Sequence, residues 1–267
     1  MNKKNIFNTF FSSIFSTSKI KAKKSNEVDN SIYEKYGDKW YTTFEDPVAL
    51  LRAESIAKTP WVLEKIQASN GHTILDIGCG GGFLSNALAM EGFKVTGVDL
   101  SPLSLKIAAD HDQSHSVDYK VADAYKLPFA NETFDVITAM DFLEHVEDPN
   151  KIIHEASRVL KPGGIFIFHT FNRNIFSWLV IIKFVEWLVR NTPKNMHVIR
   201  LFIKPKELIE YCRKSRMLVQ DMIGIRPIVS SIPLKNIFSG IVPKSLRFKL
   251  TRSLRLSYMG VARKRFN

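Results

Sequence analysis

The feature that most constrains the fold is a run of glycines directly after a short apolar segment. The apolar segment is 73–77, the run is GCGGG at 78–82, and Asp76 stands two residues before the first glycine. Glycines at such a point permit positive φ angles and let the backbone approach a ligand closely. We therefore predict a strand, a ligand-binding turn and a helix here, in that order.

The chain around this run alternates strand and helix patterns. Strands are expected at 73–77, 94–99, 117–121, 133–138, 165–169, 218–223 and 254–262. Asp-Pro or Ser-Pro pairs mark three helix starts, because Asp and Ser cap helices and proline suits the first turn. The alternation predicts an α/β fold with a doubly wound, mostly parallel sheet of seven strands. Two insertions, at about 172–203 and 225–250, interrupt a domain that covers 31–267.

Candidate ligand-binding residues also follow the next three strands. Asp99 can accept hydrogen bonds from two ribose hydroxyls, Asp123 can bind an adenine amino group, and Met140 can pack on adenine or a methionine moiety. Each alone also fits a structural role, since Asp is common in turns and Met in cores. Their joint position at the carboxyl ends of strands favours a ligand site. With Asp76 before the glycines, the spacing suits a sulfonium nucleoside better than a dinucleotide.

Residues 70–170 resemble the class I S-adenosylmethionine-dependent methyltransferases. The resemblance rests on the glycine run and the acids above, together with Leu127-Pro128-Phe129 and the segment LKPGG at 160–164. It implies a Rossmann-like fold with S-adenosylmethionine as cofactor. The residues implied to hold the cofactor are Asp76, Gly78, Gly80, Asp99, Asp123 and Met140.

Two carboxylates and an imidazole lie within five residues directly after the fourth strand. They belong to Asp141, Glu144 and His145. A spacing of three and four residues predicts one shared helical face, on which these side chains could bind a divalent cation or act as a catalytic base. The alternative is structural, with His145 as a turn residue capped by Glu144.

Residues 135–215 are similar to the O-methyltransferases of ubiquinone biosynthesis, which methylate polyprenylated catechols. The similarity rests on NRN at 172–174, SWL at 177–179, EWLVR at 186–190 and FIKP at 202–205. It implies a lipid-like phenolic acceptor, partner enzymes of quinone biosynthesis, and Mg²⁺ held by Asp141, Glu144 and His145. It also implies an Arg that contacts the cofactor, for which Arg52 is the candidate. Asp141 departs from the family pattern by being one methylene shorter.

Charge is distributed unevenly along the chain. Within a total of +12, residues 1–24 carry +6, residues 25–171 carry −10 and residues 172–267 carry +16. Basic flanks indicate an anionic partner such as membrane lipid. We expect the arm 1–30 to be disordered or close to a membrane, and 175–190 to form a helix in the interface or over the active site, with a buried helix as the alternative. The predicted location is the cytoplasm at the inner face of the membrane, or the mitochondrial matrix in a eukaryote.

Other functions fit parts of the sequence. An RNA methyltransferase would use the basic flanks, but these are interleaved with aliphatic residues and no Asn-Pro-Pro-Tyr-like segment is present, so nucleic acid is not expected. A non-catalytic adapter is disfavoured by the intact glycine run, whereas another lipid or small molecule as acceptor stays open. Cys79 and Cys212 lie far apart and indicate neither a disulfide framework nor a zinc site, which fits a reducing compartment.

Overall fold

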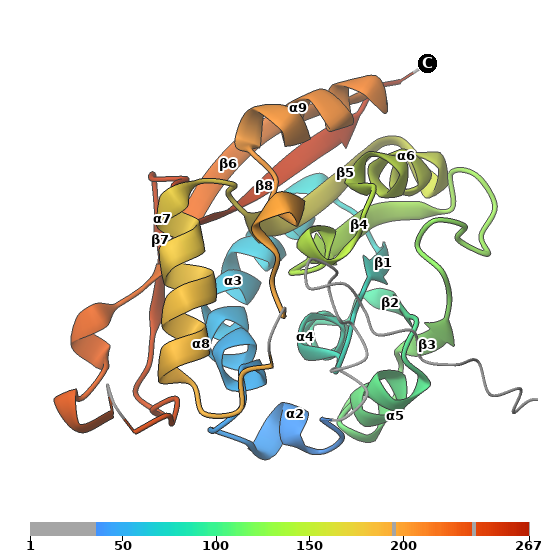
Figure 1. Ribbon diagram of the computed structural model, residues 1–267. Helices are drawn as coiled ribbons and strands as arrows, with labels where there is room; N and C mark the ends of the chain where they lie inside the picture. The colour runs from blue at the N-terminus through green and yellow to red at the C-terminus, as the bar shows by residue number, and fades with distance from the viewer. Residues whose placement is uncertain (1–35, 194–195, 237–238, 267) are drawn as a thin grey trace, which may run out of the picture.

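One twisted sheet of eight strands forms the centre of the molecule in the computed structural model, which describes residues 36–193, 196–236 and 239–266 (Figure 1). The strand order is β3-β2-β1-β4-β5-β8-β6-β7. The strands are β1 (Thr73–Ile77), β2 (Lys94–Asp99), β3 (Asp118–Val121), β4 (Phe134–Met140), β5 (Leu160–Phe171), β6 (Met217–Pro227), β7 (Phe248–Thr251) and β8 (Ser257–Lys264). The predicted arm 1–30 lies outside the described residues.

The sheet has a parallel half and an antiparallel half. Strands β3, β2, β1, β4 and β5 pair in parallel, whereas β8 pairs antiparallel with both β5 and β6, and β7 pairs antiparallel with β6. The chain reverses its direction of travel across the sheet between β1 and β4, which is where open α/β sheets bind ligands. The predicted α/β fold class is confirmed, and β7 is an additional strand inside the range expected to be the second insertion.

Helices precede or connect the strands of the sheet. The principal ones are α3 (Val48–Ser69), α4 (Phe83–Met90), α5 (Pro102–Asp110), α6 (Pro149–Val159) and α9 (Pro205–Lys214), and a short α2 (Lys39–Thr42) precedes them. Two predicted caps are present, because the Ser101 side chain accepts from the amide of Ser104 at 3.2 Å and Asp148 accepts from the amide of Lys151 at 3.2 Å. Each leaves the following proline in the first turn, where its missing N–H has no consequence.

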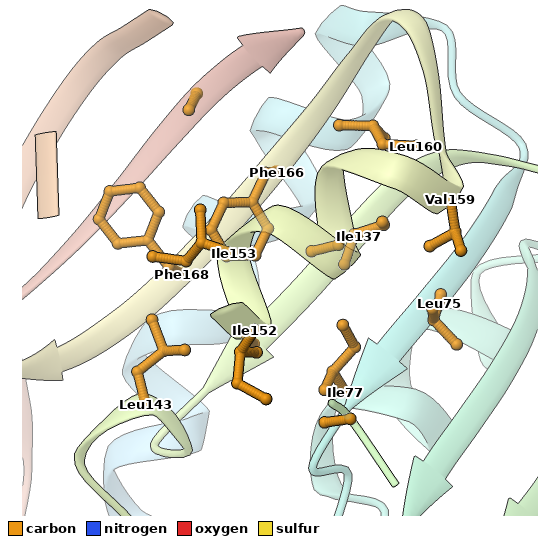
Figure 2. Packing of buried hydrophobic residues seen from close by; sticks show 14 of the residues in the cluster. Leu75, Ile77, Ile137, Leu143, Ile152, Ile153, Val159, Leu160, Phe166 and Phe168 are labelled. Atoms are coloured by element: carbon orange, nitrogen blue, oxygen red, sulfur yellow. The ribbon is translucent and has the colours of Figure 1, made fainter. Parts of the chain in front are cut away.

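Both faces of the sheet are covered. On one face, α6 and α9 pack on side chains of β1, β4 and β5 in a cluster that includes Ile137, Ile152 and Phe166 (Figure 2). On the other face, α3 and α4 pack through Val62 and Leu88. All five of these side chains are fully buried. This double coverage explains why the central strands β1 and β4 are mostly apolar and buried.

The two predicted insertions lie beside each other on α3. The first forms α7 (Ile175–Ser177), the π-helix η3 (Trp178–Phe184), α8 (Val185–Leu188) and the 3₁₀ turn η4 (Ile199–Leu201), and the second contains the 3₁₀ turns η5 (Val229–Ser231) and η6 (Leu234–Asn236). Val189 and Val242 share an apolar cluster with Ala49 of α3. In the part of the chain that the structure describes, no helix is long and apolar enough to cross a membrane.

Candidate active site

A cavity of about 720 Å³ opens at the carboxyl ends of β1, β2 and β4. Its volume lies in the ordinary range for a small-molecule site. One wall is made by strand ends and the loops after them, including Gly78, Asp99 and Met140. The opposite wall is made by α3 through residues such as Ser55 and Lys58. The two walls differ in chemistry and are described in turn.

The glycine run shapes the first wall. Gly78 and Gly80 adopt φ angles of 69° and 52°, which L side chains rarely adopt. A Cβ at Gly80 would lie 2.9 Å from the ring of Trp40, and one at Gly78 would lie 2.3 Å from the ring of Phe142. The run is therefore needed both for its backbone conformation and for the close approach of two aromatic rings.

Two buried acids hold this wall in shape. Asp99 accepts hydrogen bonds from the amides of Gly80 at 3.0 Å and Ser101 at 2.9 Å, and burial raises the pKa of its carboxyl. Asp76 accepts from the hydroxyls of Ser85 at 2.6 Å and Thr138 at 2.7 Å, and burial raises its pKa to about 6. Asp99 thus joins the glycine run to the end of β2, and Asp76 joins β1 to β4 and α4.

The chemistry of the first wall fits a cationic nucleoside. Asp76, Asp99 and Asp123 all line it, as does Met140, while Lys58 on the opposite wall is the only Lys or Arg among the described lining residues. A dinucleotide would bring two phosphates to this acidic surface, whereas a sulfonium nucleoside brings a positive charge. The acidic lining therefore suits the cationic S-adenosylmethionine better than a dinucleotide.

Arg52 does not line the cavity. Its guanidinium donates hydrogen bonds to the carbonyls of Trp40 at 2.9 Å and Thr43 at 2.6 Å and lies over the ring of Phe44. The proposed cofactor contact of Arg52 is thus replaced by an indirect role, in which Arg52 fixes the segment that carries Trp40. Trp40 itself lines the cavity and is not indicated by any sequence motif.

The second wall carries a buried network of charges from three elements. Lys58 of α3 is hydrogen-bonded through Nζ to Asp141, which follows β4, and lies 3.8 Å from Glu54 Oε2. His169 of β5 places Nδ1 2.6 Å from Asp141 Oδ1 and Nε2 3.4 Å from Glu54 Oε1. Asp141 is the most exposed member, at 16% of its side chain, and it faces the cavity.

Charge pairing decides the protonation of this network. Burial acts to raise the pKa of Asp141, but the charges of Lys58 and His169 outweigh burial and hold that pKa well below its usual range. Burial acts to lower the pKa of Lys58, but Asp141 and Glu54 outweigh it and raise that pKa. Asp141 is therefore a carboxylate and Lys58 an ammonium at neutral pH.

Glu144 and His145 have different surroundings from Asp141. Glu144 is fully buried outside the cavity lining, accepts a hydrogen bond from Thr170 at 2.8 Å, and has its pKa raised by burial to about 8. His145 lines the cavity with its ring 5.2 Å from that of His197, and burial lowers its pKa to about 4. At neutral pH Glu144 is thus mainly protonated and His145 is neutral.

The predicted helical face does not exist. Asp141 has a φ of 54° and precedes the 3₁₀ turn η2 (Leu143–His145) instead of lying within a helix. Among the described residues, the group of three possible ligands whose atoms lie within 4.8 Å of one another is Glu54, Asp141 and His169, without Glu144 or His145. Asp141, Glu144 and His145 therefore do not fit a Mg²⁺ site in this conformation, because their ligand atoms do not converge.

Three members of the network, Glu54, Lys58 and His169, are absent from the sequence-based prediction. A weak signal exists in the sequence, since His169 interrupts the apolar strand IFIFHTF at 165–171 and Glu54 and Lys58 have an i,i+4 spacing in a helix that packs on the sheet. A buried charge needs a partner, so these residues could be flagged as paired. Asp141 could not be named as their common partner, because it lies in a different element, 83 residues from Lys58.

The chain is similar to curated methyltransferases. A family profile described as a methyltransferase domain matches residues 75–168. The ubiquinone biosynthesis O-methyltransferase of Erwinia tasmaniensis is 32% identical over 231 residues, covering 85% of this chain and 88% of that protein. The protein of the same name from Escherichia coli is 32% identical over 220 residues, covering 79% and 91%.

Solved structures share the fold. A SAM-dependent methyltransferase from Thermotoga maritima matches with a TM-score of 0.55 at 22% identity, over 87% of this chain and 98% of that one. A SAM-dependent methyltransferase from Methanosarcina mazei matches with a TM-score of 0.53 at 23% identity, over 73% and 93%. These likenesses support the arrangement of strands and helices around the cavity.

Proposed function

The chain belongs to the ubiquinone biosynthesis O-methyltransferase family and is a SAM-dependent methyltransferase, and on this premise we propose that it methylates a phenolic hydroxyl of a polyprenylated quinone precursor. The observation that carries the proposal is the cavity with two unlike walls. One wall suits a cationic methyl donor, and the other presents an ionised carboxylate and a neutral imidazole. Relatives that match most of the chain carry the name of this activity.

The first wall binds the donor in this proposal. Asp99 and Asp123 accept hydrogen bonds from it, Met140 packs against it, and Gly78 and Gly80 leave room for it. S-adenosylmethionine supplies a methyl group activated by a sulfonium. Alignment of the acceptor oxygen behind that methyl group contributes much of the rate, because it replaces a bimolecular encounter.

The second wall prepares the acceptor. A phenol with a pKa near ~10 is mostly protonated at neutral pH and attacks poorly. The carboxylate of Asp141 and the imidazole of His145 line this part of the cavity and are both able to accept a hydrogen bond from the phenol. Asp141, whose pKa lies well below its usual range, accepts a hydrogen bond that orients the O–H, and the proton passes to the neutral imidazole of His145 as the O–CH₃ bond forms.

The decisive experiment compares acceptors. Purified protein is incubated with methyl-labelled S-adenosylmethionine and either a polyprenyl catechol, a neutral lipid extract or total RNA. Label should enter the catechol and the lipid extract, with a mass gain of one methyl group on oxygen. Label confined to RNA would refute the acceptor assignment, and label in a different lipid would replace it.

We also propose that the first insertion docks the enzyme on an anionic membrane, at the inner face where a polyprenyl acceptor and partner enzymes of quinone biosynthesis would be found. The insertion exposes Ile175, Phe176, Trp178 and Leu179 next to one another in sequence, with exposed fractions from 37% to 82%. The net charge of +16 in residues 172–267 adds attraction to anionic lipid. Ile182, in contrast, is buried and belongs to the core of this insertion.

Liposome flotation tests the docking proposal. Leu179→Asp should abolish flotation with anionic vesicles, because a carboxylate cannot enter the interface, and high salt should weaken wild-type binding. Ile209→Asp is the matched control, since Ile209 of α9 is exposed to a similar extent, 41% against 40%. Equal flotation of both variants and the wild type would contradict docking through this surface.

A further inference from the structure

We propose that Lys58 is the positive charge that holds the acceptor oxygen during methyl transfer, so that this enzyme works without a divalent cation. The inference rests on the proposed function, because it needs an acceptor hydroxyl beside the donor. It concerns the second wall of the cavity, where an O-methyltransferase must stabilise a developing phenolate. A fixed ammonium and a metal ion can both provide that stabilisation.

The placement of Lys58 suits this role. The residue lines the cavity together with Ser55 and Thr59, one turn or less away on α3. Its side chain is 4% exposed, so the ammonium lies where water screens it little. Within the described residues Nζ makes one hydrogen bond, to Asp141, although an ammonium has three protons to donate. Protons are therefore left for an oxygen that enters the cavity.

The surroundings of Lys58 have the composition of a cation site. The ligand atoms of Glu54, Asp141 and His169 lie within 4.8 Å of one another, which is a spacing that a metal ion could use. Lys58 is ion-paired with both carboxylates of that group. A divalent ion placed among these ligands would lie beside the ammonium and be repelled by it. The ammonium thus takes the position that a metal would need.

Two further residues orient this charge without lining the cavity. His169 is fully buried and contacts both Asp141 and Glu54. Glu54 is one helical turn from Lys58 on the same face of α3. Both are positioning residues, because Glu54 pairs with Nζ directly and His169 contacts the two carboxylates that pair with it. Lys58 and Asp141 are the members of this group that line the cavity, and Lys58 is the one that brings a positive charge to the acceptor.

The chemical step balances with these residues alone and the donor. The phenol O–H bond breaks and its proton passes to the neutral imidazole of His145, which lines the same cavity. The oxygen lone pair forms the O–CH₃ bond while the S–CH₃ bond breaks, and that electron pair returns to sulfur. The Lys58 ammonium offsets the negative charge on oxygen before the new bond is complete.

The first experiment measures turnover with and without metal. Wild-type kcat should be unchanged after treatment with EDTA and unchanged when Mg²⁺ is added. Lys58→Met, which keeps the length of the side chain, should lower kcat by roughly 100-fold or more while the KM for S-adenosylmethionine stays within about twofold. The pH optimum should move upward, because more phenolate must then come from solution. Lys65→Met is the control, since Lys65 lies on α3 outside the cavity lining and pairs with Asp221.

The second experiment needs no acceptor, so it remains informative if the proposed substrate is wrong. Wild-type protein should bind no Mn²⁺ by calorimetry, whereas Lys58→Ala should bind one equivalent among Glu54, Asp141 and His169. Removal of one ligand in Lys58→Ala/His169→Ala should abolish that binding. Mn²⁺ should then restore part of the turnover that Lys58→Ala loses, because the ion takes the place of the ammonium.

Clear outcomes would overturn the inference. Loss of wild-type turnover in EDTA with recovery in Mg²⁺, or stoichiometric Mn²⁺ binding by the wild type, would show that a metal and not Lys58 supplies the charge. An unchanged kcat in Lys58→Met would show that Lys58 does not hold the acceptor oxygen. The single variants could fail to fold because a buried carboxylate is left unpaired. In that case the double variant Lys58→Met/Asp141→Asn, which removes both charges, replaces them in the experiment. The two measurements on the wild type do not depend on any variant.

Discussion

The two walls of the cavity are built in different ways. The donor wall comes mainly from short segments at the ends of successive parallel strands, with Gly78 and Gly80 after β1 and Asp99 ending β2. The proposed acceptor wall presents Lys58 and Asp141, which are 83 residues apart, and His169 contacts Asp141 from outside the cavity lining. A local motif therefore identifies the cofactor, while the groups that handle the acceptor depend on how distant elements pack. Four substitutions test this division, from the largest expected effect to the smallest.

Asp141→Asn should have the largest effect and should fall on turnover. Asn tolerates the positive φ at this position and keeps the size of the side chain, but it loses the charge that holds Lys58 and His169. We expect kcat to fall on the order of 10²–10³-fold, with affinity for S-adenosylhomocysteine changed less than about threefold. Steady-state kinetics and calorimetry measure the two effects. Asp221→Asn, which removes an exposed acid paired with Lys65, is the control. If donor affinity fell together with turnover, the two walls would not have separate roles.

Asp99→Ala should have the opposite pattern and weaken donor binding. The substitution removes the carboxylate that accepts from the Gly80 amide and faces the cavity. Loss of a hydrogen bond to a charged group costs about 1.5–3 kcal/mol, so the Kd of S-adenosylhomocysteine should rise roughly 10–100-fold. Calorimetry measures it, and Asp110→Ala on the exposed surface of α5 provides the comparison. An unchanged Kd would remove Asp99 from the donor site.

Asp76→Asn should alter the dependence of stability on pH. The folded pKa of Asp76 is raised to about 6, above the ~3.9 of an unfolded chain. Between these values the unfolded state loses the proton first, so this group makes the wild type less stable as pH rises, until the effect levels off above about pH 6. Asn does not titrate and can still bond the hydroxyls of Ser85 and Thr138. Urea unfolding should therefore show the variant gaining on the order of 2 kcal/mol relative to wild type between pH 4 and pH 8.

That prediction has a simple contradiction. If the difference between Asp76→Asn and wild type is the same at pH 4 and pH 8, the carboxyl of Asp76 titrates at its ordinary pKa in the folded protein. Asp76 would then be better solvated than its 3% exposure indicates.

Glu144→Gln should have the smallest effect, although Glu144 is only three residues from Asp141. Its carboxyl has a pKa of about 8, lies outside the cavity lining and bonds Thr170, so a neutral amide of the same size replaces a group that is already mainly neutral at pH 7. We expect kcat within about threefold of wild type. A loss comparable with that of Asp141→Asn would show that Glu144 acts as a carboxylate and would revive a metal role for this segment.

The sequence placed residues at the cavity more readily in one of these regions than in the other, for a physical reason. The predicted cofactor residues Asp76, Gly78, Gly80, Asp99, Asp123 and Met140 all line the cavity. Parallel strands point their carboxyl ends to one edge, so residues that follow successive strands are necessarily neighbours. Arg52 lies on a helix and does not follow a strand, so the sheet does not direct it to this edge. It donates hydrogen bonds to backbone carbonyls instead of lining the cavity.

The segment 141–145 shows where periodicity stops being informative. A spacing of three and four residues predicts one helical face, but Asp141 adopts a left-handed conformation and precedes the 3₁₀ turn that holds Glu144 and His145, so the three residues do not share a helix. One residue with positive φ is enough to send adjacent side chains into different surroundings. As a result Asp141 is ionised among Lys58 and His169, while Glu144 is buried beside Thr170.

The sequence by itself determined the α/β fold, the edge of the sheet that binds a ligand, the nature of the methyl donor and the membership of a methyltransferase family. Those properties follow from local patterns, namely strand and helix periodicity, glycines at a turn and acids at strand ends. Only the tertiary structure decided which charges face the acceptor, because Lys58 and His169 are ordinary residues of a helix and a strand until packing places both against Asp141. Pairing with Asp141 and Glu54 then keeps Lys58 charged, since a charge removed from water persists only beside its partner.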